Sequence, residues 1–163
     1  MNIQDYVTHP FTKFDKDWGL LTVGVQDDFN SMTISWGGMG TLWYKPMLFL
    51  FVRPTRYTFE FLSRHDELTV SFYEDEYRNV LANIFGLKSG RDIDKAKEAG
   101  LTQKVLRDGI TYEEASETLV CRKLFIQPLN KNDFPELALQ LYQGDKETNA
   151  HHLILAEVMR IES

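Results

Sequence analysis

Short apolar or alternating segments, of the length and composition of β-strands, dominate the first half of the chain. Residues 20–25 (LLTVGV) and 32–36 (MTISW) flank a polar stretch, residues 26–31, and together predict a β-hairpin. Residues 47–52 (MLFLFV) form a continuous apolar run, as expected for a strand that is buried on both faces or that lies at a subunit interface. Residues 67–73 (ELTVSFY) alternate and predict a further strand.

Helical spacing interrupts these strands in three places. Residues 57–64 and 77–85 place their apolar side chains on one stripe each, and Gly86 is a plausible cap for the second helix. Residues 94–99 predict a short polar helix that ends at Gly100. These pieces are too short and too irregularly placed to alternate with the strands.

The last third of the chain returns to strands, at residues 117–127 and 152–161, while residues 134–142 are ambiguous. Many short strands, a few short helices and no regular strand–helix alternation favour a mainly β protein, a β-barrel with helical excursions. A doubly wound parallel sheet would need that alternation. The length of 163 residues suits a single domain over residues 1–163.

Charge and composition narrow the class of partner. The net charge of −6 argues against a nucleic-acid surface, which is normally basic, but a phosphate needs only two or three well-placed cations. The longest apolar run, residues 47–52, is far shorter than the roughly 20 residues of a membrane-spanning helix. The N-terminus has no signal-peptide pattern, so a cytoplasmic protein without a membrane partner is expected.

Cysteine and histidine usage does not favour a metal site. Cys121 is the single cysteine, which excludes an intrachain disulfide, and its place in a strand favours a buried, inert thiol. His9 and His65 are isolated. His151 and His152 are adjacent, so on a strand their side chains would point to opposite faces and would not share a metal.

A strand followed by a glycine-rich segment is the first stretch with candidate chemistry. On the strand MTISW, Thr33 and Ser35 fall on one face. Met32, Ile34 and Trp36 fall on the other and would pack into the core. The segment that follows, GGMG, predicts a loop whose backbone amides a flat ligand can approach, although a plain strand and turn would show the same spacing. It lacks the GxGxxG spacing of a dinucleotide site.

The second candidate stretch is the turn RPTRYT, residues 53–58. It places two guanidinium groups, two threonine hydroxyls and the start of a predicted helix within six residues. Guanidinium groups and helix N-termini both bind phosphate, so the turn has the chemistry of a mononucleotide phosphate site. The alternative is a solvated turn in which Thr55 or Thr58 caps the helix.

Several separated motifs, in one order along nearly the whole chain, resemble the flavin-reductase-like, FMN-binding split-barrel family that includes the flavoredoxins. They are NSMTISWG, LWYKP, VRPTRYT, SGRDIDKAKEAGL, ASETLVCRKL and HLILAEV. The resemblance implies a split, Greek-key-like antiparallel barrel. It also implies cofactor-binding residues, which are Asn30, Met32, Thr33, Ser35, Trp36 and Gly37 at the ring and its ribityl chain, Arg53, Thr55, Arg56, Tyr57 and Thr58 at the phosphate, and Lys95 from a flexible flap.

The same resemblance implies FMN as cofactor, NADH or NADPH as a possible reductant, and a homodimer with the flavin at the two-fold interface. It implies an oxidoreductase of flavin reductase or flavoredoxin type, which a nicotinamide or a partner protein would supply with electrons. A non-catalytic FMN carrier, store or sensor is the alternative. The only candidate catalytic residue is His151. Family members usually read G-D-x-H before it, whereas this chain reads GDKETNAHH, with extra residues between Asp145 and His151.

Overall fold

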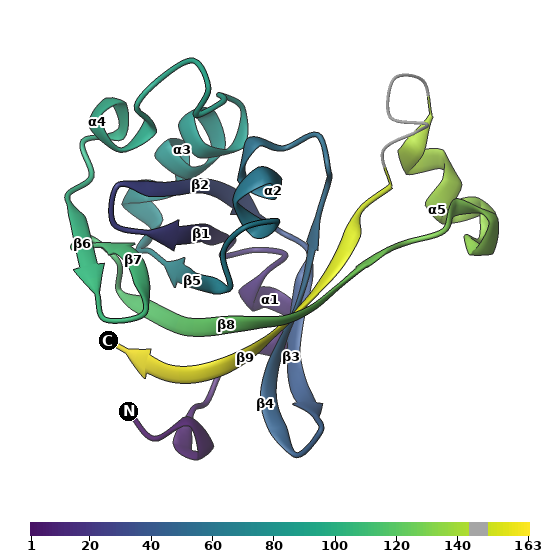
Figure 1. The fold of residues 1–163 in the computed structure, drawn as a ribbon, viewed down its shortest axis with the longest axis horizontal. Helices are drawn as coiled ribbons and strands as arrows, with labels where there is room; N and C mark the ends of the chain where they lie inside the picture. The colour runs from purple at the N-terminus through teal and green to yellow at the C-terminus, as the bar shows by residue number, and fades with distance from the viewer. Residues whose placement is uncertain (144–149) are drawn as a thin grey trace.

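Seven strands of the computed structural model, which describes residues 1–143 and 150–163, pair antiparallel in one sheet. They are β1 (Gly19–Val25), β2 (Asp28–Ile34), β3 (Gly37–Leu42), β4 (Lys45–Val52), β5 (Glu67–Phe72), β8 (Glu117–Pro128) and β9 (His152–Glu162). Their order is β2-β1-β5-β8-β9-β4-β3 (Figure 1). The two ends of this order, β2 and β3, are separated along the chain by Ser35 and Trp36 alone. The sheet therefore curls into an antiparallel barrel that is split beside these two residues.

A second, two-stranded sheet and several short helices cover the barrel. The strands β6 (Gln103–Leu106) and β7 (Gly109–Tyr112) form a hairpin beside β1 and β5. The α-helices are α1 (Pro10–Lys13), α2 (Tyr57–Leu62), α3 (Arg78–Val80), α4 (Lys95–Ala99) and α5 (Glu136–Leu139). Shorter turns of 3-10 helix are η1 (Ile3–Asp5), η2 (Asp75–Tyr77), η4 (Lys131–Asp133) and η5 (Gln140–Tyr142), and η3 (Leu81–Gly86) is a π-helix.

Strand β1 is buried on both faces and joins two apolar cores. Leu21 and Val23 face the main core inside the barrel, whereas Leu20 faces a second core formed with η3 and β7. Thr22 has its hydroxyl 2.8 Å from that of Ser31. A buried hydroxyl needs such a partner, because leaving it without one costs about 1–3 kcal/mol. Strand β2 is itself part of the barrel, and the covering element η3 packs against it.

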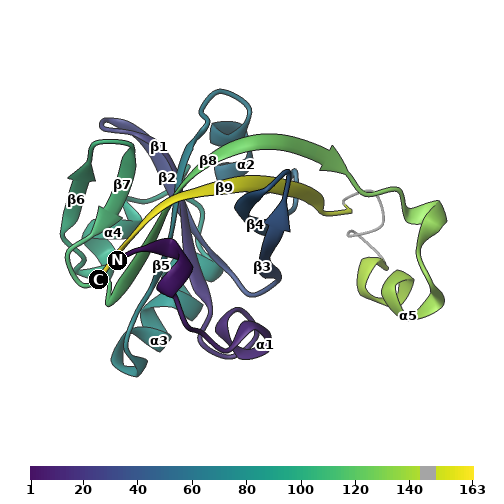
Figure 2. The ribbon, with the colours of Figure 1, turned by 90° about the horizontal axis from the view of Figure 1, so that it is seen from below.

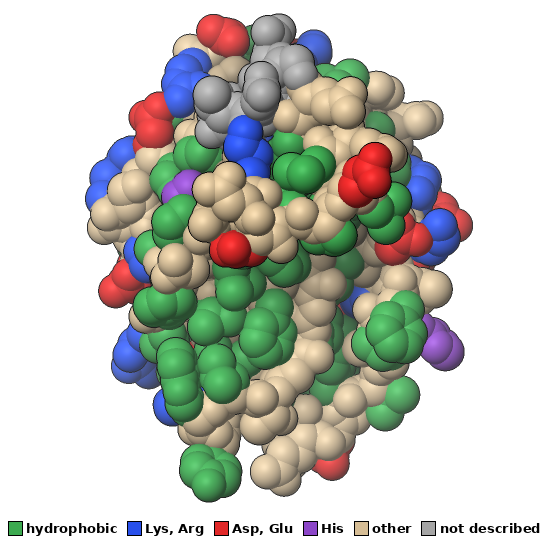
Figure 3. Space-filling view, turned by 90° about the vertical axis from the view of Figure 1, so that its right-hand side faces the viewer, with side chains coloured by type: hydrophobic (Ala, Val, Ile, Leu, Met, Phe, Trp, Pro, Cys, Tyr) green, Lys and Arg blue, Asp and Glu red, His purple; other side chains and the backbone are tan. Residues whose placement is uncertain are grey.

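Residues 117–122 of β8 pair with β5. The rest of β8 leads into an arm, residues 123–143, which projects from the barrel and carries α5 at its tip (Figure 2). Large apolar side chains are exposed on the arm, among them Phe125, Leu137 and Leu141. Trp43 and Tyr44 are also exposed, at the tip of the β3–β4 hairpin. Figure 3 shows the side of the molecule on which the arm lies, where hydrophobic side chains gather into a broad patch.

Most predicted elements are confirmed with small shifts of their ends. The first hairpin is present, but β2 begins at Asp28, so the turn is shorter than residues 26–31. The helix predicted over residues 94–99 is α4, with the Asp94 carboxylate accepting from Lys97 N and Gly100 in the left-handed region at φ 70°. The helix predicted over residues 77–85 is present as η2, α3 and η3 in succession.

Two predictions about local structure are wrong. The GGMG segment is strand β3, paired with β4, and not a loop. A Cβ on Gly37 would lie 3.0 Å from Phe49 O, and one on Gly40 would lie 3.2 Å from the Phe49 ring. These glycines therefore allow close strand packing, which a sequence pattern of glycines does not distinguish from a turn. The strand predicted to reach Trp36 ends at Ile34, because the chain crosses there from β2 to β3.

Candidate functional site

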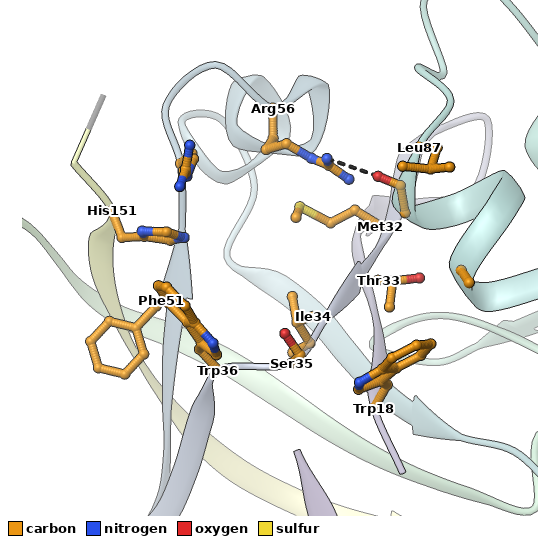
Figure 4. Close-up of a pocket in the computed structure, with 13 residues that line it drawn as sticks. Trp18, Met32, Thr33, Ile34, Ser35, Trp36, Phe51, Arg56, Leu87 and His151 are labelled. Atoms are coloured by element: carbon orange, nitrogen blue, oxygen red, sulfur yellow. Dashed lines mark hydrogen bonds between the residues drawn. The ribbon is translucent and has the colours of Figure 1, made fainter. Parts of the chain in front are cut away.

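A wide cavity of about 440 Å³ lies at the split of the barrel (Figure 4). One wall is the end of β2 with the two residues that follow it, and the other is the end of β4. Trp36 lies beside His151, and their ring centroids are 4.8 Å apart. The lining residues are Trp18, Met32, Thr33, Ile34, Ser35, Trp36, Phe51, Arg53, Arg56, Ala82, Gly86, Leu87 and His151. This is a mostly apolar slot with a cationic end.

A smaller polar cavity of about 180 Å³ shares Met32, Arg56 and Leu87 with the wide cavity. Cations, hydroxyls and an amide line it, and no aspartate or glutamate is among its described lining residues. These are Asn30, Met32, Thr55, Arg56, Tyr57, Thr58, Leu87, Lys88, Ser89, Arg91 and Lys95. Lys88 and Arg91 pair with Glu98 and Glu60 respectively, whereas Arg56 and Lys95 are in none of the ion pairs of the described residues. These two cations, with the hydroxyl donors, suit a small anion.

Arg56 stands where the two cavities meet. Its guanidinium donates to Gly86 O at 3.0 Å (Figure 4). It also donates to Phe85 O at 3.3 Å. Both carbonyls lie at the C-terminal end of η3, where helix carbonyls carry negative partial charge. Burial, and then the positive charge of Arg53, lower the pKa of Arg56 from its usual value. Arg56 is thus fixed by neutral carbonyls, without a carboxylate partner among the described residues.

Lys95, the first residue of α4, is a second buried cation and is only 6% exposed. Its ammonium donates to Ser31 O at 3.0 Å and to Phe85 O at 3.3 Å, so it meets Arg56 at the same carbonyl. Burial, and then repulsion by Arg56, lower the pKa of Lys95 from 10.5 to about 8. Among the described ion pairs none includes Lys95, so an anion in the polar cavity would be its counter-ion.

Asn30 connects strand β2 to helix α2 at the polar cavity. Its amide donates to Thr58 Oγ1 at 2.8 Å. A Cβ on Gly90 would lie 2.1 Å from Asn30 Oδ1, so only glycine permits this close approach, which sets Ser89 and Arg91 at the cavity. The alternative in which Thr55 or Thr58 caps α2 is not seen, because α2 begins after Arg56 without a side-chain cap.

At the other end of the site, the Tyr142 hydroxyl and Nδ1 of His151 are 2.5 Å apart. Burial, and then the positive charge of Arg53, lower the pKa of His151 from 6.5 to about 4. The imidazole is therefore neutral at physiological pH. Arg53 also lies over the Tyr142 ring, with its guanidinium carbon 5.4 Å from the ring centroid.

The structure brings most of the predicted site residues together. Met32, Thr33, Ser35, Trp36 and Arg53 line the wide cavity. The polar cavity collects the remaining predicted residues other than Gly37, namely Asn30, Thr55, Arg56, Tyr57, Thr58 and Lys95.

Some expectations fall outside the two cavities, and some lining residues were missed. Gly37 lines neither cavity, since it lies in β3 against Phe49. Asp145 and the rest of residues 144–149 lie outside the described part of the chain. Several lining residues were not singled out from the sequence, namely Trp18, Phe51, Leu87, Lys88, Ser89 and Arg91. The SGRD motif was the only signal for Ser89 and Arg91.

Over residues 1–143 and 150–163, no cluster of three or more His, Cys, Asp or Glu side chains has the geometry of a metal site. None of the helices in the described ranges has the length and apolar character that a bilayer crossing requires. The burial predicted for Cys121 is confirmed, and it raises the pKa of the thiol.

Comparison with known families fits this geometry. The sequence model described as "Flavin reductase like domain" matches residues 12–162. The chain belongs to this family. No curated protein matches this flavin-reductase-like chain significantly.

Solved structures share the fold of this flavin-reductase-like chain at low sequence identity. An FMN-binding protein from Thermus thermophilus with bound 1-cyclohex-2-enone is 16% identical, with a TM-score of 0.70 over 100% of this chain and 79% of that chain. Flavoredoxin from Methanosarcina acetivorans is 20% identical, with a TM-score of 0.67 over 100% and 73%. The styrene monooxygenase flavin reductase from Pseudomonas putida S12 is 14% identical, with a TM-score of 0.65 over 90% and 79%.

Proposed function

We propose that this chain binds FMN and works as an oxidoreductase of flavin reductase or flavoredoxin type. The observation that carries the proposal is the pair of buried cations, Arg56 and Lys95, at a cavity without acidic lining residues, next to a wide apolar slot. A buried cation without a counter-ion is costly, so such a pair favours binding of an anion. The phosphate of a flavin mononucleotide is an anion of the right size for the polar cavity.

The residues present fit FMN at both of its ends. Thr33, Ser35 and Trp36 would meet the ring and the ribityl chain in the wide cavity. The phosphate would lie in the polar cavity against Arg56 and Lys95, with the hydroxyls of Thr55, Thr58 and Ser89 as further donors. A mostly apolar slot with a few polar groups is the usual form of a cofactor site.

Bound FMN would supply the redox chemistry, so the protein's own contribution is to bind, orient and polarise. Arg53 and Arg56 place positive charge beside the wide cavity, which favours an anionic ring system within it. Trp36 and Phe51 line one side of the slot. The proposal requires no side chain to act as a nucleophile, because the cofactor carries the electrons. Either a nicotinamide or a partner protein could donate them.

The first experiment titrates FMN and riboflavin into the apoprotein, followed by flavin fluorescence and by calorimetry. We expect FMN to bind more tightly than riboflavin, because only FMN carries the phosphate that Arg56 and Lys95 would hold. Equal affinities would contradict the phosphate assignment. Consumption of NADH and of NADPH is then measured with and without added FMN. Steady turnover supports a reductase. Bound FMN without turnover indicates either a non-catalytic FMN carrier or an oxidoreductase that receives its electrons from another protein.

We further propose a homodimer, in which a second copy of the chain covers the exposed apolar side chains of the arm. Patches of this kind are rare on monomers. Leu87 at the rim of the wide cavity is 79% exposed, which leaves that cavity open on the side where a partner copy would close it. The double variant Leu137→Asp with Leu141→Asp is expected to be monomeric in light scattering. Val7→Asp, at an exposed apolar residue outside the arm, is the control. A wild-type monomer that holds FMN at micromolar concentration would refute the dimer.

A further inference from the structure

Tyr142, at the end of η5, links the tip of the arm to the wide cavity. Within residues 131–143 it is the one buried side chain, and it is 6% exposed. Its ring lies 5.4 Å from that of Phe134 and 5.6 Å from that of His151. The arm therefore meets the site through a single, well-packed aromatic side chain.

The hydrogen bond between Tyr142 and His151 has a preferred donor. The imidazole is neutral, because burial and Arg53 keep the pKa of His151 at about 4. A neutral imidazole has one protonated and one accepting nitrogen. A phenol is far more acidic than a neutral imidazole N–H, and imidazole nitrogen is the better acceptor, so the phenol donates to Nδ1. The ring proton then lies on Nε2.

We infer that Tyr142 is a positioning residue that holds His151 as the neutral Nε2–H tautomer, with this N–H directed into the wide cavity as a hydrogen-bond donor. Figure 4 shows the far end of the His151 ring turned towards the cavity. Trp36 packs against one face of the ring, with centroids 4.8 Å apart, and restricts its rotation. The tautomer is thus set by Tyr142 and the ring orientation by Trp36.

A neutral donor has a distinct use at this place. Arg53 and Arg56 already provide positive charge at the cavity, and a charged imidazole would be repelled by Arg53. The Nε2–H instead offers one directional hydrogen bond to an oxygen or nitrogen acceptor on the edge of a flat ring. The ligand part of this inference rests on the proposed FMN function, whereas the tautomer does not.

The tautomer is tested on ¹⁵N-labelled apoprotein by long-range ¹H–¹⁵N correlation of the imidazole signals at neutral pH. We expect His151 to show an unprotonated Nδ1 and a protonated Nε2. In Tyr142→Phe, which keeps the aromatic ring and loses only the hydroxyl, both nitrogen shifts should move towards the average of two exchanging tautomers. A protonated Nδ1 in the wild type, or unchanged shifts in Tyr142→Phe, would overturn the inference. Tyr6→Phe removes a hydroxyl bonded to Glu117 and is the control.

The donor role is tested by adding FMN to the same samples. Saturation with FMN should shift the His151 Nε2–H signal, and an unshifted signal at saturation would overturn the role of this N–H. If Tyr142→Phe populates both tautomers equally, its FMN dissociation constant rises about twofold, because half of the molecules lack the inward N–H. His151→Phe should raise it about two- to tenfold, as for the loss of one hydrogen bond. If FMN does not bind the wild type at all, the proposed function fails while the apoprotein tautomer still stands or falls on its own spectrum.

Discussion

Replacing Lys95 by methionine is expected to stabilise the apoprotein and to weaken FMN binding at the same time. The fall in the pKa of Lys95 from 10.5 to about 8 corresponds to roughly 3 kcal/mol by which its charge destabilises the folded apoprotein. Methionine removes that charge at nearly equal length. It also removes the hydrogen bonds to Ser31 O and Phe85 O, at about 1 kcal/mol each. The net gain at pH 7 is about 1 kcal/mol, or roughly 2–4 °C in melting temperature.

The stability difference between Lys95→Met and the wild type should depend on pH. In the unfolded chain Lys95 titrates near 10.5 and in the folded apoprotein near 8, so between these pH values the unfolded chain binds more protons. The wild type therefore gains stability from this group as the pH rises from about 8 towards 10.5. The advantage of the variant is complete below about pH 8. It disappears at about pH 9, because the wild type gains about 1.4 kcal/mol per pH unit in this range, and it reverses to a deficit of about 2 kcal/mol towards pH 10.5. Thermal melts of both proteins across pH 7 to 10 measure it.

The affinity for FMN should change in the opposite sense. Loss of a charge-assisted hydrogen bond to the phosphate is worth about 1.5–3 kcal/mol, or about ten- to 150-fold in the dissociation constant. Wild-type affinity should also fall as the pH rises through about 8, where Lys95 loses its proton, and Lys95→Met should lack this decline. Lys97→Met, on the exposed side of the same helix, is the control. A Lys95→Met protein with native FMN affinity and a less stable apoprotein would refute the reasoning.

Three further outcomes are expected. Arg56→Ala should weaken FMN binding by about 1.5–3 kcal/mol in calorimetry and leave riboflavin binding nearly unchanged; an unchanged FMN affinity would make the turn merely structural. Trp36→Ala should lower FMN affinity and alter the flavin absorption spectrum, while Trp36→Phe preserves most of both. If Trp36→Ala instead only lowers the apoprotein melting temperature, Trp36 belongs to the core and not to the site. The Cys121 thiol should stay unreactive towards a thiol reagent until the protein unfolds, because it is buried and its pKa is raised; rapid labelling of the native protein would contradict its burial.

Local signals were sufficient for most elements of the fold. The alternation of β5 and the capping pair Asp94 and Gly100 of α4 each lie within a few neighbouring residues, so the sequence predicts them correctly. Gly37 and Gly40 of β3 were misread because a glycine pattern does not show the close contacts that explain them. Gly37 lies against Phe14 and Phe49 O, and Gly40 lies against the Phe49 ring. The β6–β7 hairpin was not predicted either, since its strands have only four residues each and carry little periodicity.

The candidate site divides in the same way. The arginines of the RPTRYT turn could be predicted, because their chemistry and spacing are local. Trp18 and Leu87 could not, since only the folded chain brings their segments to the end of β2. Tyr142 lies in a segment with no clear pattern, and its importance comes from one contact with His151. Residues that act through a long-range contact leave no periodic signal in the sequence.

The carbonyl end of η3 explains how an acidic chain keeps two cations at one small cavity. Arg56 and Lys95 both donate to Phe85 O, so a single helix terminus orients both without neutralising either. A carboxylate in that position would stabilise the apoprotein more, but it would compete with a phosphate for the same donors. The π-helical widening of η3 is the kind of irregularity that occurs often at functional sites. The apolar stripe of residues 77–85 predicts a helix that ends at Gly86. It does not predict that the carbonyls of Phe85 and Gly86 accept hydrogen bonds from Arg56 of the RPTRYT turn and from Lys95 of α4.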